Sequence, residues 1–162
     1  MDYLSMLDRR VVVPDSPVAD RVIRGAKIDL DAHRVVALVV SEEGQRRWEV
    51  PIADLQSLGG DSPSVPSGEL LRPVKYEGGR IVLGRHGGVI GASVVSTEAK
   101  RKGRIVDLWF SPGTGRVTRY DVSRGWLRDR FTGARVLDPE QVVSAFLDRF
   151  VIEGPLCARA SA

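Results

Sequence analysis

Short runs of β-branched residues, separated by Gly, Pro, Asp and Ser, extend along most of the chain. Valine is the commonest apolar residue, and apolar positions alternate with polar ones, which is typical of half-buried strands. Turns are predicted where the breaking residues cluster, as at residues 111–115, where a proline fixes φ and glycines are free to adopt positive φ. The pattern predicts strands at residues 10–13, 20–28, 34–40, 47–51, 89–96, 102–110, 116–122, 125–131 and 134–137.

One helix is predicted in the last quarter of the chain. Asp138 is a favourable N-cap and Pro139 a favourable first helical residue. Apolar residues then recur at helical spacing at Val142, Val143, Phe146, Leu147 and Phe150. A shorter helical segment is expected at residues 53–58, ended by Gly59 and Gly60.

The second half of the chain repeats the pattern of the first. An offset of 82 residues pairs Val12–Val13 with Val94–Val95, Ile23 with Ile105 and Arg34–Val35 with Arg116–Val117, without a gap. After an insertion of five residues the offset is 87, and it pairs Ser57 with Ser144 and Asp61 with Asp148. The alternative is chance matching of two valine-rich sets of strands.

Each repeat is too short to leave one face of a sheet in water, so we expect each sheet to curl into a small barrel around its own interior. Two such barrels in one chain could pack together through exposed edges, or exchange their terminal strands. We assign residues 1–66 to the first barrel, 67–88 to a connector, 89–153 to the second barrel and 154–162 to a flexible tail.

Four segments of the second half follow a known order. They are residues 91–96 (GASVVS), residues 102–108 (KGRIVDL), residues 114–117 (TGRV) and residues 137–144. Over residues 89–152 the chain resembles the PRC-barrel domain family, whose pattern has a strand after a glycine, a G-x-V-x-D strand and a T-G-R-V turn. The first half looks like a degenerate copy, because residues 21–25 (RVIRG) have Arg21 and Gly25 where the second half has Gly103 and Asp107, and residues 31–35 (DAHRV) replace the turn. The expected fold is therefore all-β, with two PRC-barrel-like barrels in tandem and a short helix near the C-terminus.

The resemblance also has implications for function. Domains of this family occur in the cytoplasmic part of a photosynthetic reaction-centre subunit and in a ribosome-maturation factor. They are generally protein-interaction or regulatory modules without a catalytic set of residues. The resemblance therefore implies a compact six-stranded barrel and a non-enzymatic role.

Composition and charge bear on where the protein acts and on what it binds. No apolar run among the 162 residues approaches the roughly 20 residues of a membrane-spanning helix. Acidic residues near the N-terminus argue against a signal peptide, and a single cysteine excludes an internal disulfide, so we expect a cytoplasmic protein of bacterial type. Residues 1–66 carry 8 basic and 11 acidic side chains, whereas residues 67–162 carry 16 and 10. The surplus of six positive charges in the second half is either ordinary variation in composition or a feature that steers binding to RNA or to an acidic protein surface.

Two segments are candidate interaction sites. The densest positive cluster comprises Lys100, Arg101, Lys102 and Arg104, which could contact phosphates or simply form a solvated loop. On a strand over residues 125–131, Trp126, Arg128 and Arg130 would share one face and could anchor a partner, or Trp126 could close a barrel end.

Catalytic and metal-binding chemistry is weakly indicated. His33 and His86 lack metal-ligand spacing, Cys157 has no nearby histidine, and the glycine-rich residues 84–91 are not followed by a helix. Asp107, within an apolar strand, is either a buried functional acid or an acceptor of hydrogen bonds from a neighbouring turn. We therefore expect no catalytic residues, no metal and no cofactor.

The sequence favours a non-enzymatic interaction, adaptor or regulatory module, whose partner is an unidentified protein or a second copy of the chain in a homodimer. The alternative is an RNA- or ribosome-associated maturation factor that uses the basic second half. An enzyme or small-ligand binder that uses a cleft between the barrels is a third class, which the site analysis disfavours.

Overall fold

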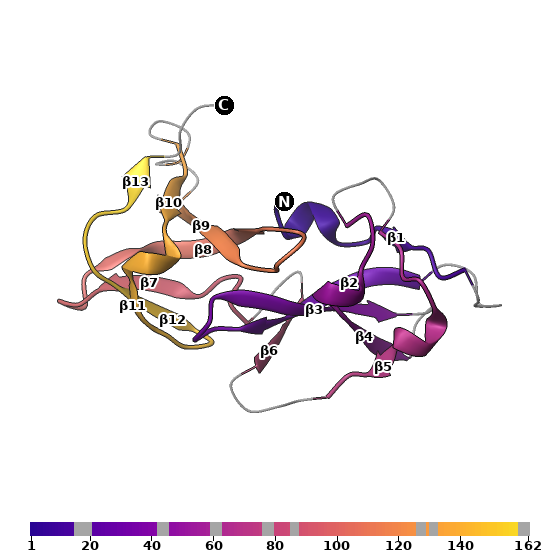
Figure 1. The fold of residues 1–162 in the computed structure, drawn as a ribbon. Helices are drawn as coiled ribbons and strands as arrows, with labels where there is room; N and C mark the ends of the chain where they lie inside the picture. The colour runs from indigo at the N-terminus through magenta and orange to yellow at the C-terminus, as the bar shows by residue number, and fades with distance from the viewer. Residues whose placement is uncertain are drawn as a thin grey trace.

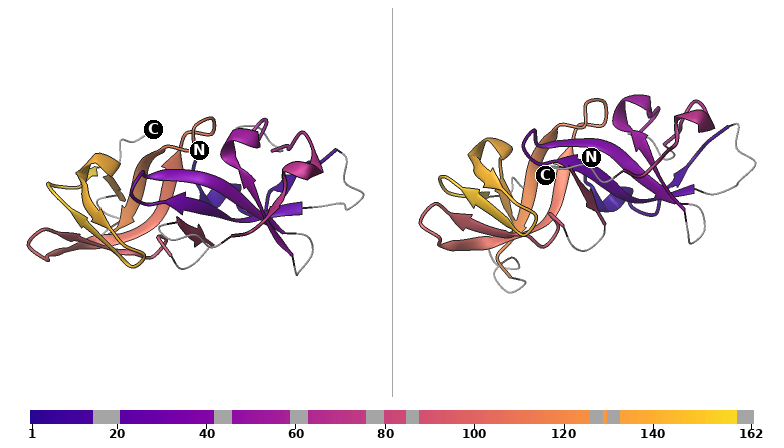
Figure 2. Two further views of the ribbon diagram at one scale, coloured as in Figure 1. Left: turned by 60° about the horizontal axis from the view of Figure 1, so that its bottom comes forward. Right: turned by 90° about the horizontal axis from the view of Figure 1, so that it is seen from below.

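Two curled sheets, each a half-barrel, make up the protein, one from each half of the chain (Figures 1 and 2). The computed structural model describes residues 1–14, 21–41, 46–58, 63–75, 80–84, 88–125, 129 and 133–158. Within these residues the fold is all-β, as predicted, and its helical segments are short.

The first sheet has the order β1-β2-β3-β4-β5, and β6 also pairs with β2. Its strands are β1 (Arg10–Val11), β2 (Arg21–Asp29), β3 (Arg34–Ser41), β4 (Arg47–Pro51), β5 (Arg72–Pro73) and β6 (Arg80–Leu83). Three single-turn 3-10 helices belong to this half and the segment before it: η1 (Leu4–Met6), η2 (Ile52–Asp54) and η3 (Gly68–Leu70).

The second sheet has the order β11-β12-β7-β8-β9-β10-β13. Its strands are β7 (Ser93–Ser96), β8 (Arg101–Phe110), β9 (Val117–Ser123), β10 (Arg135–Leu137), β11 (Val142–Ala145), β12 (Arg149–Ile152) and β13 (Cys157–Ala158). The 3-10 helix η4 (Pro139–Gln141) connects β10 to β11. All pairs in this sheet are antiparallel except β12 with β7.

The two halves share one topology. The offset of 82 residues places β2 on β8 and β3 on β9, and the offset of 87 places η2 on η4. In the first half, Ser64 forms an antiparallel bridge with Gln56 and a parallel bridge with Val12. These two bridges correspond to the β11–β12 and β12–β7 pairings of the second half.

Equivalent residues of the two halves meet at the centre of the molecule. Arg34 and Arg116, which the offset of 82 makes equivalent, form an isolated antiparallel bridge. The Val35 amide donates to the Gly115 carbonyl and the Val117 amide donates to the His33 carbonyl, both at 2.8 Å. Each hydrogen bond is the counterpart of the other under the same offset, so the bridge lies on an approximate two-fold axis.

Each half also lends a strand to the other. Residues 1–3, the N-terminal arm, lead into the first half but pair with β8, through an Asp2–Trp109 bridge and a hydrogen bond from the Tyr3 amide to the Leu108 carbonyl (2.8 Å). Conversely, β6 leads into the second half but pairs with β2, with Lys27 opposite Val82. Because Lys27 and Trp109 are equivalent by the offset of 82, the exchange is reciprocal.

The hydrophobic core differs from the expected pair of separate interiors. Buried residues of both halves belong to one cluster, which includes Ile23, Val35, Leu108, Tyr120 and Phe150. Tyr3, from the arm that precedes the first half, is fully buried in it. Because the halves exchange strands, their interiors join into a shared core.

The predicted C-terminal helix is wrong beyond its first turn. Asp138 does cap η4, since its carboxylate accepts from the Glu140 amide (2.9 Å), but Val142 is already extended and begins β11. Residues 142–152 then form the β11–β12 hairpin, with Ala145 opposite Phe150. The β-branched pair Val142 and Val143 favours a strand, and Phe150 is buried on β12, where it pairs with Val94.

Two further segments differ from their predicted form. A strand was expected over residues 125–131, but Asp129 is helical and its amide donates to the Gly125 carbonyl (2.9 Å). The other candidate residues of this segment, Trp126, Arg128 and Arg130, lie outside the described residues. The helical segment expected at residues 53–58 is reduced to η2, and residues 67–88, expected as a connector, supply β5 and β6.

Candidate functional site

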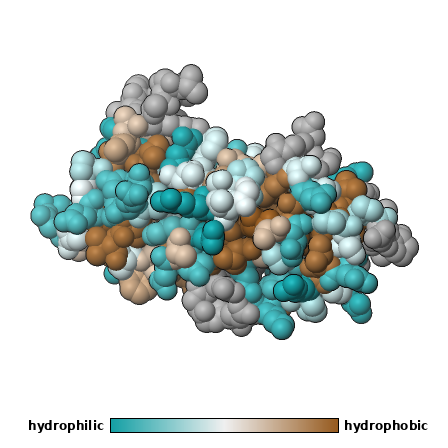
Figure 3. Space-filling view, in the orientation of Figure 1, coloured by the Kyte–Doolittle hydropathy of each residue, from teal (hydrophilic) through white to brown (hydrophobic). Residues whose placement is uncertain are grey.

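The β7–β8 hairpin carries the basic residues that the sequence singled out. Lys100 lies at its tip, where its ammonium is 2.7 Å from the Glu98 carboxylate and both side chains are largely exposed. A neighbouring acid therefore offsets the charge of Lys100, and this pair is a solvated ion pair of small energetic value. Figure 3 shows that the end of the molecule formed by this hairpin is mainly hydrophilic.

Gly103 allows β8 and β9 to pack closely beside the basic residues. At this glycine φ is +155°, and a Cβ would lie 2.5 Å from the Ser123 carbonyl oxygen and 2.6 Å from Val122 Cγ1. Only a residue without a side chain allows β9 to approach so closely. Because side chains alternate along a strand, Lys102 and Arg104 project from the opposite, outer face of β8.

A hollow of about 450 Å³ opens on this outer face. It is lined by Arg101, Lys102, Gly103, Arg104, Val106, Ser123, Arg124 and Gly125. A second hollow of about 250 Å³ adjoins it, because Lys102 and Arg124 line both. Its other lining residues are Arg135, Pro155 and Leu156.

We call the two hollows together the basic groove. Five cationic side chains line it, Arg101, Lys102, Arg104, Arg124 and Arg135, and none of the described lining residues is acidic or aromatic. These five side chains carry the hydrogen-bond donors that an anionic ligand in the groove could satisfy.

Asp129 organises the loop beside the groove. Its carboxylate accepts from the Ser123 hydroxyl and, at 3.1 Å, from the Arg124 amide. These bonds fix the backbone that follows β9 and so fix the start of the Arg124 side chain. Both carboxylate oxygens thus accept hydrogen bonds at the end of β9, and Asp129 is not one of the residues that line the groove.

The sequence identified part of this site. Of its candidates, Arg101, Lys102 and Arg104 line the groove, whereas Lys100 is paired with Glu98 away from it. Arg124 and Arg135 were missed. A usable signal existed for Arg124, because a hairpin about the turn at residues 111–115 places the end of β9 beside Arg104, as the Arg104–Ser123 pairing shows.

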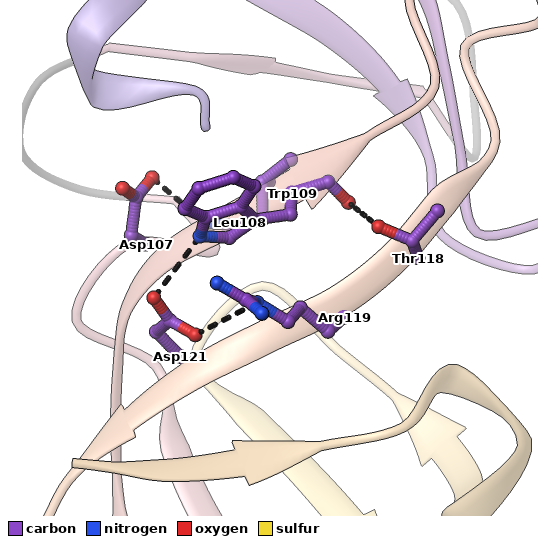
Figure 4. A network of polar contacts seen from close by, with 6 residues as sticks. All are labelled: Asp107, Leu108, Trp109, Thr118, Arg119 and Asp121. Carbon is purple, nitrogen blue, oxygen red and sulfur yellow. Dashed lines mark hydrogen bonds and ion pairs between the residues drawn. The ribbon is translucent and has the colours of Figure 1, made fainter. Parts of the chain in front are cut away.

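A separate polar network lies further along β8 and β9 (Figure 4). The Trp109 indole donates to the Asp121 carboxylate (3.1 Å), and Arg119 pairs with the same carboxylate (3.4 Å) while its guanidinium lies 4.1 Å from the centre of the Trp109 ring. The charge of Arg119 is thus neutralised by a buried acid, so this network stabilises the sheet and is not a second anion site.

Asp107 has a structural role at the contact between the halves. Its carboxylate accepts from the Leu4 amide (3.2 Å) and from the Leu108 amide (2.8 Å). Burial raises the pKa of this carboxyl, and the two backbone hydrogen bonds partly oppose that shift. Asp107 therefore accepts hydrogen bonds from a neighbouring turn, the second of the two roles expected from the sequence.

Comparison with known proteins identifies the half of the chain that carries the groove. The sequence model of the PRC-barrel domain matches residues 88–155. The second half of the chain is a PRC-barrel domain. That match does not extend to residues 1–87, and the chain has no match among the curated proteins with which it was compared.

The PRC-barrel domain contacts the first half through a histidine. His33 lies in the turn between β2 and β3, as expected, but its side chain is half-buried against the PRC-barrel domain rather than free in solvent. Its Nδ1 atom is 2.7 Å from the Tyr120 hydroxyl, and the two rings are edge to face. Burial raises the pKa of Tyr120, so this hydroxyl stays protonated and can donate to a neutral imidazole.

The pH dependence of stability should reveal this contact. Burial lowers the pKa of His33 below 6.5, and the charges of Asp31 and Asp29 only partly oppose the shift. The unfolded chain therefore binds a proton at His33 first as the pH falls. The contribution of His33 to stability is thus fully present above its unfolded pKa of about 6.5 and is lost as the pH drops from there towards the lowered pKa. We expect His33→Asn, which tolerates the positive φ at this position, to reduce that fall in urea unfolding at pH 7.5, 6.5 and 5.5. Equal pH slopes for both proteins would show that His33 is not responsible, since His86 is common to both.

Other sequence candidates add no further site. Cys157 is exposed on β13, and His86 lies outside the described residues. The described residues contain no group of three or more His, Cys, Asp or Glu side chains placed to hold a metal ion. Among those same residues, no helix has the length and apolar character that crossing a membrane requires.

Proposed function

We propose that the chain is a non-enzymatic protein-interaction module of the cytoplasm, and that its PRC-barrel domain binds an acidic segment of a partner protein in the basic groove. The observation that carries the proposal is the lining of that groove. Lys102 and Arg124 line both hollows, Arg104 and Arg135 extend the charge to either side, and no described lining residue is acidic.

The chemistry of the groove fits a peptide. Arginine forms bidentate hydrogen bonds with carboxylates, and arginines are enriched at protein interfaces. Val106, Pro155 and Leu156 supply apolar surface between the cations, against which aliphatic parts of a peptide can pack. Single-stranded RNA is bound mainly by stacking on aromatic side chains, and the described lining residues include none.

Binding in such an exposed groove depends on several charges acting together. One exposed ion pair contributes about 0–1 kcal/mol, so a set of four or five supports only modest affinity and rapid association. The interaction should weaken when salt rises from about 50 to about 200 mM, because screening shortens the range of each charge. These are the properties of a reversible adaptor rather than of a permanent subunit.

The proposal is tested by charge reversal in the groove. We expect a fluorescent peptide of alternating Glu and Asp residues to bind the wild-type chain, and Lys102→Glu/Arg124→Glu to weaken that binding by at least about tenfold. Fluorescence anisotropy titrations measure both. The matched control is Arg46→Glu/Arg72→Glu, which makes the same charge change at exposed positions of the first half and should alter affinity less than twofold (about 0.4 kcal/mol).

Two results contradict the proposal. One is equal loss in the groove variant and in the control, which would mean that only net charge matters. The other is tighter binding of an oligouridine than of the peptide at equal charge and salt, with loss in the groove variant; that result would favour the RNA-associated alternative.

A further inference from the structure

The tip of the β11–β12 hairpin exposes large apolar side chains. Phe146 and Leu147 are 58% and 52% exposed, and Val143 on the neighbouring edge strand is 59% exposed. The hairpin closes with the Phe146 amide donating to the Arg149 carbonyl (2.8 Å), so Leu147 occupies a tight turn. Turns of this kind favour Gly, Asn and Asp, so an apolar Leu147 in the turn is unusual. The exposed Phe146 beside it enlarges the apolar surface in contact with water.

The matching positions of the first half of the sequence carry no large apolar residue. Under the offset of 87, which superposes η2 on η4, Val143 corresponds to Gln56, Phe146 to Gly59 and Leu147 to Gly60. The sequence of the first half therefore has polar or small residues at all three corresponding positions. Large apolar side chains that are exposed here, and that the matching positions of the first half lack, point to a function in binding.

We call Val143, Phe146 and Leu147 the apolar tip, and one of them, Leu147, lines a hollow next to the basic groove. A hollow of about 480 Å³ beside it is lined by Gly88, Ile90, Gly91, Ala92, Ser93, Arg104, Leu147 and Asp148. Arg104 also lines the basic groove, so the hollow at the apolar tip and the basic groove share this arginine. A single extended segment that passes Arg104 would contact both.

We propose that the partner segment is amphipathic, with apolar residues that pack against the apolar tip and an acidic stretch that continues past Arg104 into the basic groove. The charges of the lining residues determine which end of the partner segment lies at the apolar tip. Asp148 lines the hollow at the tip and would repel a carboxylate there, whereas the described lining of the groove is cationic. The inference rests on the proposed function and adds the apolar half of the recognition surface.

Titrations with two peptides distinguish binding at the apolar tip from binding in the basic groove. The first carries only Glu and Asp, and the second carries the same acidic stretch preceded by Leu and Phe. We expect the wild-type chain to bind the second at least about tenfold more tightly. Phe146→Gly/Leu147→Gly, which installs the residues of the first half, should bind both peptides as the wild type binds the purely acidic one, with the same dependence on salt.

A second variant controls for any effect of the two new glycines on the conformation of the hairpin. Phe146→Thr/Leu147→Asn keeps a strand-favouring residue before a turn-favouring one and should remove the preference to the same extent. Thermal unfolding should be nearly unchanged in both variants, because the replaced side chains are exposed. Lys102→Glu/Arg124→Glu should lose affinity for both peptides while keeping their order.

The inference is overturned if the wild type does not prefer the amphipathic peptide, or if the tip variants retain the preference; binding of the acidic peptide would then still support the proposed function. The tip variants also test two other ligands of the apolar tip, a lipid surface and a second copy of the chain. Sedimentation of wild type, but not of the tip variants, with phosphatidylcholine vesicles containing roughly one-fifth phosphatidylserine would assign the tip to a lipid surface. A dimer on size exclusion that the tip variants convert to monomer would assign it to a second copy of the chain. Either result would overturn the proposal.

Discussion

Replacing Gly115 by alanine is expected to destabilise the protein by about 3 kcal/mol or more, because it breaks the bridge between the halves. Gly115 has a φ of +71°, and an added Cβ would lie 2.0 Å from the Val35 carbonyl oxygen. No rotation relieves that overlap, since the obstacle is backbone and not the end of a flexible side chain. Relief requires β3 to move away, which costs both hydrogen bonds of the Arg34–Arg116 bridge.

The same turn supplies a matched control. Gly113 lies two residues earlier, and a Cβ there would meet nothing within 4 Å. Gly113→Ala should therefore change the free energy of unfolding, measured by urea titration, by less than about 1 kcal/mol. If Gly115→Ala were as mild as Gly113→Ala, the close approach of the two halves at Val35 would be contradicted.

The strands of both halves could be predicted because their signals are local. Alternation of valine with polar residues located β2, β3, β8 and β9 to within a few residues, and the proline and glycines of residues 111–115 located the turn between β8 and β9. The PRC-barrel resemblance of the second half is confirmed by the family match to residues 88–155. These features depend on residues close together in sequence.

The prediction of a C-terminal helix was wrong because the spacing of its apolar residues fits two structures. Apolar residues at positions 142, 143, 146, 147 and 150 fit helical spacing, but they also fit a hairpin with an apolar tip. Spacing alone cannot choose between these, since the choice depends on whether β7 is available to pair with β12. The structure pairs Phe150 with Val94, and this long-range contact decides the outcome.

The candidate site was only partly predictable for the same reason. Lys102 and Arg104 stand out in a continuous basic run, whereas Arg124 and Arg135 are isolated in sequence and join the groove only through the pairing of β8, β9 and β10. The residues of the apolar tip were visible in the sequence but were assigned to the apolar face of a helix. Their exposure became evident only once the hairpin was known.

Exchange of strands between the halves is the least local feature of the fold. The sequence admitted it as one possibility, but no pattern within residues 1–3 identifies β8 as their partner. In the structure the two exchanged segments meet, because the Tyr3 hydroxyl donates to the Gly84 carbonyl (3.2 Å) just after β6. Tyr3 therefore connects the N-terminal arm, β8 and the segment that enters the PRC-barrel domain.

We accordingly expect Tyr3→Ala to destabilise the whole protein by about 4 kcal/mol, in the range measured for loss of a buried aromatic ring. The ring is 0% exposed, and its removal leaves a cavity in the core that both halves share. Urea unfolding followed by fluorescence should show one transition at lower urea for both halves, because each contributes to that core. Tyr3→Phe is the control: it keeps the ring and loses the bond to Gly84, at a cost of about 1 kcal/mol. A Tyr3→Ala protein in which only one half unfolds early, or in which stability is unchanged, would contradict a shared core held together by exchanged strands.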